Sequence, residues 1–328
     1  MRLRLCALVA TGLLVSAISV AQENAPLRLE KEIALANVKG RIDHMSVDTE
    51  GKRLFVSGLG NGTVEVIDIN QGQRVHQIDS LKEPQGLLYD INSKRLFVAS
   101  GGDGTLRAYD GNSFALLKTV ELGDDADNLR YDPQLKQVLV GYGSGGLASF
   151  DANLQKITDI KLPSHPESFQ LEHHDSRMFV NLPKSFVVAV IDRSRNEVVD
   201  KWNAPAASSN FPMALDESNG HLFVGFRDPA RLFVFNTDDG KVVAQLPIVG
   251  DTDDLFYDSA RHAIYVIGGE GFLDVFRQLD PNHYKRISRV KTSEGARTGL
   301  FVPLLNHLFI AAPRRESQPA RILVYRLD

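Results

Sequence analysis

The sequence predicts an all-β chain folded as a seven-bladed β-propeller, and three observations support this fold class. A hydrophobic triplet recurs seven times, with starts 40 to 44 residues apart. Each repeat consists of short β-branched and aromatic runs separated by turn residues, without a helical stripe. The last repeat ends one strand short at the C-terminus, whereas a spare strand precedes the first repeat. This period and strand content are typical of propeller blades.

The triplet predicts the second strand of each blade. Its seven copies are Leu54-Phe55-Val56, Leu96-Phe97-Val98, Val138-Leu139-Val140, Met178-Phe179-Val180, Leu222-Phe223-Val224, Ile264-Tyr265-Val266 and Leu308-Phe309-Ile310. An acid stands six positions before six of them, at Asp48, Asp90, Asp132, Glu172, Asp216 and Asp258. Such an acid accepts hydrogen bonds from the amides of a tight turn. We therefore expect this column to open the turn between the first two strands.

A third strand follows each triplet and a more polar fourth strand follows it in all repeats but the last, at 64–68 and 74–78 in the first repeat. The dipeptide Asn61-Gly62 predicts a type I′ turn before that third strand. In the seventh repeat the third strand, 322–326, runs almost to the C-terminus. We expect residues 29–35 to supply the missing fourth strand, because closing the ring removes an open sheet edge.

The first repeat carries the pattern most clearly, in Leu54-Phe55-Val56-Ser57 and Thr63-Val64-Glu65-Val66-Ile67-Asp68. This pattern resembles the YVTN-repeat (YncE-like) family of bacterial seven-bladed β-propellers, and the resemblance covers residues 29–328. It implies an exported propeller. The shared motifs are blade motifs, so they imply no catalytic residue, because function in such folds lies in the loops.

Residues 1–21 predict a secretory signal peptide. Arg2 and Arg4 precede an uncharged apolar run, and Ser19-Val20-Ala21 is a small-residue cleavage site. An uncleaved membrane anchor is the alternative. Residues 22–328 then form a single propeller domain, which we expect to be periplasmic or secreted, with no membrane contact after cleavage.

Composition excludes several classes of site. Cys6 is the only cysteine and lies within the predicted signal, so the mature chain has no thiol nucleophile and no zinc–thiolate site. The formal net charge is -4 for the whole chain. Loss of the two signal arginines makes it more negative, which disfavours a nucleic-acid partner. The expected partner is a small molecule or a protein.

Polar residues gather where the first strand of each blade enters the central channel. The position eleven residues before each triplet holds Asp43, Gln85, Asp127, Glu167, Phe211, Asp253 and Arg297. The next position includes His44, Asn128 and Asp254. Asn210 and His165 lie one and two positions outside the first column and are further candidates for the same site. The predicted ligand site therefore comprises Asp43, His44, Gln85, Asp127, Asn128, Glu167, Asn210, Asp253, Asp254 and Arg297.

Four acids in one ring repel one another unless a positive charge compensates them. Arg297, Arg41, ordered water or a cation are the candidates. Carboxylate oxygens suit a hard divalent cation such as Ca²⁺, so the predicted metal ligands are Asp43, Asp127, Glu167 and Asp253. A solvated polar mouth held by hydrogen bonds is the structural alternative.

Two classes of function remain open. The first is a binding propeller that holds a small ligand, a metal or a partner protein at the funnel. The second is a metal- or acid-dependent enzyme, such as a lactone hydrolase or a lyase. No catalytic signature is present in the sequence, which favours binding by a small margin.

Overall fold

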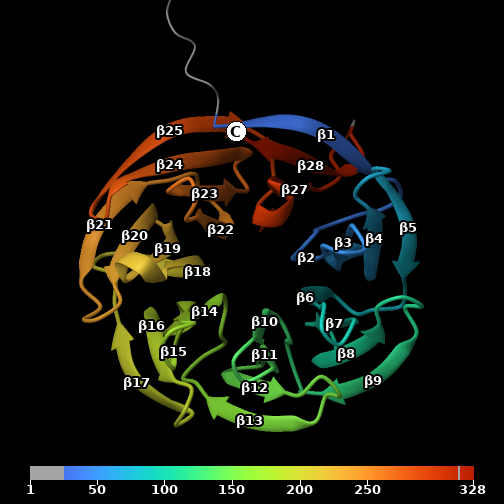
Figure 1. Ribbon diagram of the computed structural model, residues 1–328, viewed down its shortest axis with the longest axis horizontal. Coiled ribbons are helices and arrows are strands. Elements are labelled where there is room, and N and C mark those ends of the chain that lie inside the picture. Colours follow the sequence, from blue (N-terminus) through green and yellow to red (C-terminus); the bar gives the residue numbers. More distant parts are fainter. Residues whose placement is uncertain (1–25, 317) are drawn as a thin grey trace, which may run out of the picture.

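The computed structural model describes residues 26–316 and 318–328, so the predicted signal peptide at 1–21 lies outside the described residues. Seven four-stranded antiparallel sheets form a ring around a central channel (Figure 1). The predicted seven-bladed β-propeller is therefore confirmed. None of the helices in the described ranges is long and apolar enough to cross a membrane.

Each of the first six blades takes its four strands in chain order from the channel outward. Blades one to three comprise β2 (Met45–Asp48), β3 (Arg53–Gly58), β4 (Thr63–Asp68), β5 (Gln73–Ile78); β6 (Pro84–Asp90), β7 (Arg95–Ser100), β8 (Thr105–Asp110), β9 (Leu116–Glu121); and β10 (Leu129–Asp132), β11 (Gln137–Tyr142), β12 (Gly146–Phe150), β13 (Lys156–Lys161). Blades four to six comprise β14 (Phe169–Leu171), β15 (Arg177–Leu182), β16 (Val187–Asp192), β17 (Glu197–Trp202); β18 (Ser208–Asp216), β19 (His221–Asp228), β20 (Ala230–Asn236), β21 (Val242–Pro247); and β22 (Thr252–Asp258), β23 (Ala263–Gly268), β24 (Phe272–Asp280), β25 (His283–Lys291).

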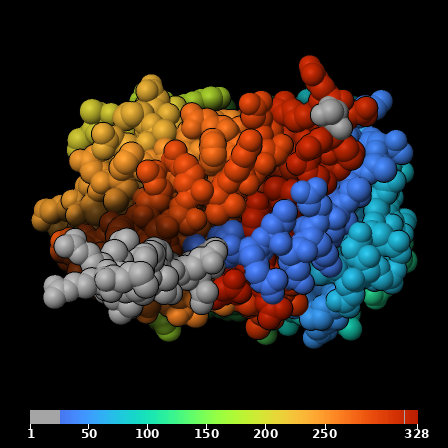
Figure 2. Space-filling view, turned by 90° about the horizontal axis from the view of Figure 1, so that it is seen from above, coloured from blue at the N-terminus to red at the C-terminus, as the bar shows by residue number. Residues whose placement is uncertain are grey.

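The seventh blade combines both ends of the described chain. It contains β26 (Gly299–Val302), β27 (His307–Ala312), β28 (Ala320–Leu327) and, as its outer strand, β1 (Leu27–Leu35). β1 lies directly beside the C-terminal strands in both views (Figure 1, Figure 2). The predicted closure of the ring by the N-terminal strand is therefore confirmed.

A β-bulge between the third and fourth strands recurs at the same place in every blade. In blade one the register shifts between Val66 and Ile67. In blade seven it shifts between Leu29 and Lys31 of β1, opposite Tyr325 and Val324. The bulge is thus reproduced even where the two strands come from opposite ends of the chain. β1 occupies a true blade position and does not merely cover an edge.

The triplet strands are buried because each lies mid-blade and packs against blades on both sides. All three residues of the first triplet are fully buried, and the others are nearly so. Aromatic side chains from neighbouring blades meet between the sheets, as in the stacked pair Phe55 and Tyr89 at 5.3 Å between ring centroids. Apolar residues on both strand faces therefore explain why the triplets are continuous runs.

The acid column opens the first turn as expected, with one exception. Asp48 accepts a hydrogen bond from the Gly51 amide at 2.9 Å, and Asp90, Asp132, Asp216 and Asp258 accept equivalent bonds. Glu172 instead binds the Arg177 guanidinium at 2.7 Å. Asp48 forms the same ion pair with Arg53 in blade one, so blade four keeps the ion pair without the turn hydrogen bond.

The turn type expected at Asn61-Gly62 is wrong. A short 3₁₀ helix, η1 (Leu59–Asn61), precedes Gly62, and only Gly62 has a positive φ, at 69°. A type I′ turn needs positive φ at both central residues. Similar single turns are η2 (Pro183–Ser185), η3 (Glu217–Asn219) and η4 (Pro303–Leu305).

Candidate binding site at the channel mouth

One backbone hydrogen bond fixes the rim acids at equivalent places in three blades. The amides of Asp43, Asp127 and Glu167 donate to the carbonyl oxygens of Ser57, Gly141 and Asn181 at 2.8, 2.9 and 3.0 Å. Those carbonyls lie near the ends of second strands. Each rim residue is therefore held by the rigid centre of its own blade, which positions its side chain precisely.

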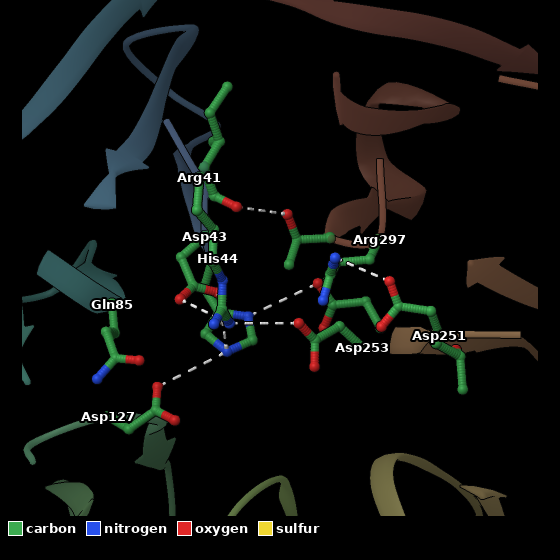
Figure 3. A network of polar contacts seen from close by, with 12 residues as sticks. Arg41, Asp43, His44, Gln85, Asp127, Asp251, Asp253 and Arg297 are labelled. Carbon is green, nitrogen blue, oxygen red and sulfur yellow. Dashed lines mark hydrogen bonds and ion pairs between the residues drawn. The ribbon is translucent and has the colours of Figure 1, made fainter. Parts of the chain in front are cut away.

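His44 lies at the centre of this ring of polar residues (Figure 3). Its Nε2 lies 3.9 Å from Asp43 Oδ1 and 3.8 Å from Asp127 Oδ1, while its Nδ1 lies 3.6 Å from Asp254 Oδ2. Burial alone would lower the pKa of His44, but the carboxylates of Asp254 and Asp43 outweigh it and raise this pKa to about 10. The imidazole is thus a cation that joins three blades.

Arginines neutralise the acids on one side of the mouth. Arg41 Nη2 lies 3.1 Å from Asp43 Oδ2 and 3.4 Å from Asp253 Oδ2. Arg227 Nη2 donates to the other Asp253 oxygen at 2.5 Å and stacks on Phe211, 3.7 Å from the ring centroid. Burial still raises the pKa of Asp43, to about 6. These contacts show that protein cations compensate two of the four predicted metal ligands.

Asp127, His165 and Glu167 form a separate cluster between blades three and four. Their candidate ligand atoms all lie within 4.8 Å of one another. His165 Nδ1 lies 2.6 Å from the Gly143 carbonyl oxygen, which only accepts, so this nitrogen carries a proton. His165 Nε2 is the nitrogen that lies 4.0 Å from Asp127 Oδ2.

The loops before β10 and β14 meet closely enough to build this cluster. A side chain on Gly141 would place its Cβ 2.9 Å from Pro166 Cγ, so only glycine lets the blade-four loop pack here. Pro166 stands between His165 and Glu167, and the Gly141 carbonyl holds the Asp127 amide. One close approach between two blades therefore sets the spacing of all three side chains.

The charges in this cluster are strongly coupled. Burial raises the pKa of Glu167, and the Asp127 charge raises it further, to about 8. Burial would lower the pKa of His165, but the nearby Asp127 carboxylate and the hydrogen bond to the Gly143 carbonyl raise it to about 9. Asp127 Oδ1 is buried without a hydrogen-bond donor in the described part of the chain. Protons on His165 and Glu167 thus balance the cluster at neutral pH.

Of the remaining predicted residues, some form polar contacts at the channel mouth and others form contacts between blades. Gln85 Nε2 donates to Asp125 Oδ1 at 3.1 Å, and Arg297 Nη2 lies 2.8 Å from Asp251 Oδ2. Asn128 is buried, and its Oδ1 finds no donor among the described residues. Asn210 Nδ2 donates to Asn181 Oδ1 at 2.9 Å, and its amide therefore ties blade five to blade four.

The predicted metal quartet is thus divided by the fold. Asp127 and Glu167 lie together with His165, whereas arginines bind Asp43 and Asp253. The predicted set takes one residue position from each repeat. It therefore leaves out side chains that reach the channel mouth from other positions in the blades. Arg227 is such a case, because it extends the second strand of blade five beyond the repeat.

Arg130 is a channel residue that the column analysis missed. It follows Asn128 by two positions on the inner strand β10 and lines the channel cavity. Strand alternation puts residues two apart on the same face. Extending each column by two positions would therefore have found it.

We expect His44 to make stability pH-dependent. The pKa of His44 in the folded protein lies above its unfolded value of 6.5. Its contribution to the free energy of unfolding is therefore complete below pH 6.5 and is lost as the pH rises toward 10. In urea titrations with a chelator present, wild type should lose on the order of 3 kcal/mol between pH 6.5 and 10. His44→Gln should make this fall in stability shallower, and the part that remains belongs to His165 and Glu167, whose raised pKa values lie in the same range.

The matched control is His173→Gln, because His173 is an exposed histidine between β14 and β15, away from the rim loops. The free energy of unfolding of His173→Gln should fall with rising pH by the same amount as that of wild type. If the free energy of unfolding of His44→Gln falls with pH as steeply as that of wild type, the His44 charge does not stabilise the ring.

Comparison with solved structures shows the same architecture. The chain aligns with a chain of Kuenenia stuttgartiensis hydrazine synthase at 16% identity and a TM-score of 0.74, covering 84% of this chain and 94% of that one. It aligns with a chain of a mitotic checkpoint complex at 13% identity and a TM-score of 0.78, covering 100% and 99%. Such low identities show the fold alone. The sequence matches no protein-family model, and comparison with curated proteins finds no relative.

Proposed function

We propose that this chain is an exported propeller of the YVTN-repeat, YncE-like group that binds a divalent metal ion at its channel mouth. The blade motifs and the predicted signal peptide support the family and the periplasmic location. The observation that carries the metal proposal is the cluster of Asp127, His165 and Glu167, in which three donor groups from two blades converge.

The orientation of His165 supports a metal ligand. Metal-binding histidines commonly donate one ring N–H to a carbonyl oxygen, which fixes the other nitrogen toward the ion. The contact between Nδ1 and Gly143 does this here and directs Nε2 toward Asp127. An ion would also satisfy Asp127 Oδ1, which has no donor in the described ranges.

The donor set favours a different metal from the calcium that the acid column suggests. An imidazole with two carboxylates suits Zn²⁺ or Mn²⁺ better than Ca²⁺, which prefers six to eight oxygens. Because Glu167 and His165 hold protons at neutral pH, binding should release protons and strengthen as pH rises.

Isothermal titration of purified protein with ZnCl₂, MnCl₂ and CaCl₂ tests this function. Wild type should bind one Zn²⁺ or Mn²⁺ per chain, and Asp127→Asn and His165→Gln should bind at least about 100-fold more weakly. Asp251→Asn is the matched control, because Asp251 is an acid of the same mouth that pairs with Arg297 instead. It should bind as wild type does.

Two results would reject the proposal. One is the absence of metal binding by wild type at neutral pH. The other is Asp127→Asn binding as tightly as Asp251→Asn, since the metal would then lie elsewhere. Proper folding of each variant is checked by its melting curve.

A metal-dependent hydrolase is the second candidate. The specific observation is that three protein ligands leave coordination positions open, as catalytic zinc sites do. Such a metal would supply an activated water. A lactone panel tests this candidate: hydrolysis by wild type that Asp127→Asn lacks would support an enzyme, and its absence would leave the binding function.

A further inference from the structure

The channel contains a cavity of about 240 Å³ next to the ring of His44 and Asp254. The inner strands of six blades line it. Its polar wall comprises His44, Ser46, Arg130, Gln170 and Asp254, and Leu88 and Phe256 are among its apolar lining. It shares no residue with the proposed metal cluster of Asp127, His165 and Glu167.

Arg130 is the exceptional residue of this cavity. Its Nη1 donates to the neighbouring Leu129 carbonyl at 2.8 Å and its Nη2 to Ser168 Oγ at 3.4 Å. An arginine has five N–H donors, so about three remain without an acceptor in the described part of the chain. Its guanidinium also lies over the Phe169 ring, 5.5 Å from the centroid.

No carboxylate oxygen among the described residues lies within ion-pair distance of Arg130. Four other buried or half-buried arginines have a carboxylate partner: Arg53 with Asp48, Arg177 with Glu172, Arg193 with Asp132, and Arg227 with Asp253. An arginine keeps its charge at all ordinary pH values, and a charge away from water is costly without a partner. Arg130 is therefore a channel cation without a direct ion pair among the described residues, and the carboxylates of Asp254 and Asp127 act on it only from a greater distance.

The one acid in the cavity wall is already engaged. Asp254 Oδ2 accepts a hydrogen bond from the Gly299 amide at 2.8 Å and lies 3.6 Å from His44 Nδ1. Asp254 is therefore not a direct partner of Arg130, and an anionic ligand would supply the missing carboxylate.

We infer that this cavity binds a small monocarboxylate, whose carboxylate pairs with Arg130 and whose apolar part contacts Leu88 and Phe256. The planar guanidinium fork matches a carboxylate with two parallel hydrogen bonds. The cavity is below the usual range of ligand pockets, roughly 300–1,000 Å³. It therefore favours a short-chain or single-ring acid over a sugar or a nucleotide. Inorganic phosphate shares the charge but has no apolar part to place.

Titration calorimetry with butyrate, benzoate, benzamide and inorganic phosphate tests this inference on the full chain in EDTA. Butyrate or benzoate should bind to wild type, whereas benzamide and phosphate should bind at least tenfold more weakly. Arg130→Gln should lose acid binding at least tenfold, and Arg130→Lys should keep part of it. Arg326→Gln is the control, because this exposed arginine of β28 lies away from the cavity.

Stability provides an independent readout. Arg130→Gln removes an uncompensated charge, so its melting temperature without ligand should equal or exceed that of wild type. A guanidinium with a purely structural role would instead lower it. If Arg130→Gln fails to fold, Leu88→Trp fills the cavity and should abolish acid binding while Arg130 stays in place.

Several results would overturn the inference. They are the failure of both acids to bind, equal binding of benzoate and benzamide, and full binding by Arg130→Gln. Acid binding that disappears in EDTA would place the anion on a metal and not on Arg130. Because the metal test uses Asp127→Asn and this one uses Arg130→Gln in chelator, failure of either proposal leaves the other measurable.

Discussion

A chain that begins at residue 37, and so lacks β1, should fail to fold stably, whereas a chain that begins at residue 26 should melt as the full protein does. β1 buries Leu27, Ile33 and Leu35 almost completely. Each buried aliphatic side chain contributes about 2 kcal/mol. The deletion therefore removes about 6 kcal/mol, comparable to the whole stability of many domains, before the lost strand pairing is counted.

The loss would extend beyond the hydrophobic contacts. β1 pairs with β28 along eight residue pairs, and its removal exposes the edge of that strand. Circular dichroism melting of both truncated chains checks the prediction. Equal melting temperatures would mean that blade seven is stable with three strands and that ring closure is not what holds the propeller.

Arg193→Met should be the most destabilising single change among the ion pairs. The Arg193 guanidinium binds the Asp132 carboxylate between blades four and three and donates to the carbonyl oxygens of Glu172 and Asp175 at 2.6 and 2.8 Å. Both charged side chains are almost fully buried. Leaving a buried carboxylate unpaired costs about 3–5 kcal/mol, which urea unfolding at pH 7 would detect.

The chain offers a matched control two residues away. Arg195 forms an exposed ion pair with Asp192, and exposed pairs contribute little, so Arg195→Met should leave the urea midpoint unchanged. The double variant Arg193→Met with Asp132→Asn should recover part of the loss. Equal effects of the changes at Arg193 and Arg195 would contradict a stabilising role for the buried pair.

Much of the fold was predictable because one signal recurs in every blade. The triplet Leu54-Phe55-Val56 and its six counterparts are continuous apolar runs, since both faces of a second strand are buried. The missing strand at the C-terminus identified β1 as the closing strand. The turn at Asn61-Gly62 was not predictable in this way, because its single left-handed residue also suits the end of a 3₁₀ turn.

The sequence predicts the position of the candidate site in the fold better than it predicts which side chains pair with one another there. The column of Asp43, Asp127, Glu167 and Asp253 contains acids that the structure places beside Arg41, His44 and His165, and their role in binding stays a prediction. Their partners come from positions outside that column: Arg227 extends a strand, and His165 lies two positions before Glu167 in an inter-blade loop. A repeat column records the backbone position that blades share, whereas pairing depends on side chains that differ from blade to blade.

We propose above all that the channel mouth binds a metal ion between blades three and four. Anomalous diffraction from crystals soaked in ZnCl₂, measured on both sides of the zinc absorption edge, tests it most directly. The account predicts one strong peak within bonding distance of His165 Nε2 and of carboxylate oxygens of Asp127 and Glu167. A mouth without an anomalous peak, or a peak held by Asp43 and Asp253 instead, would contradict it.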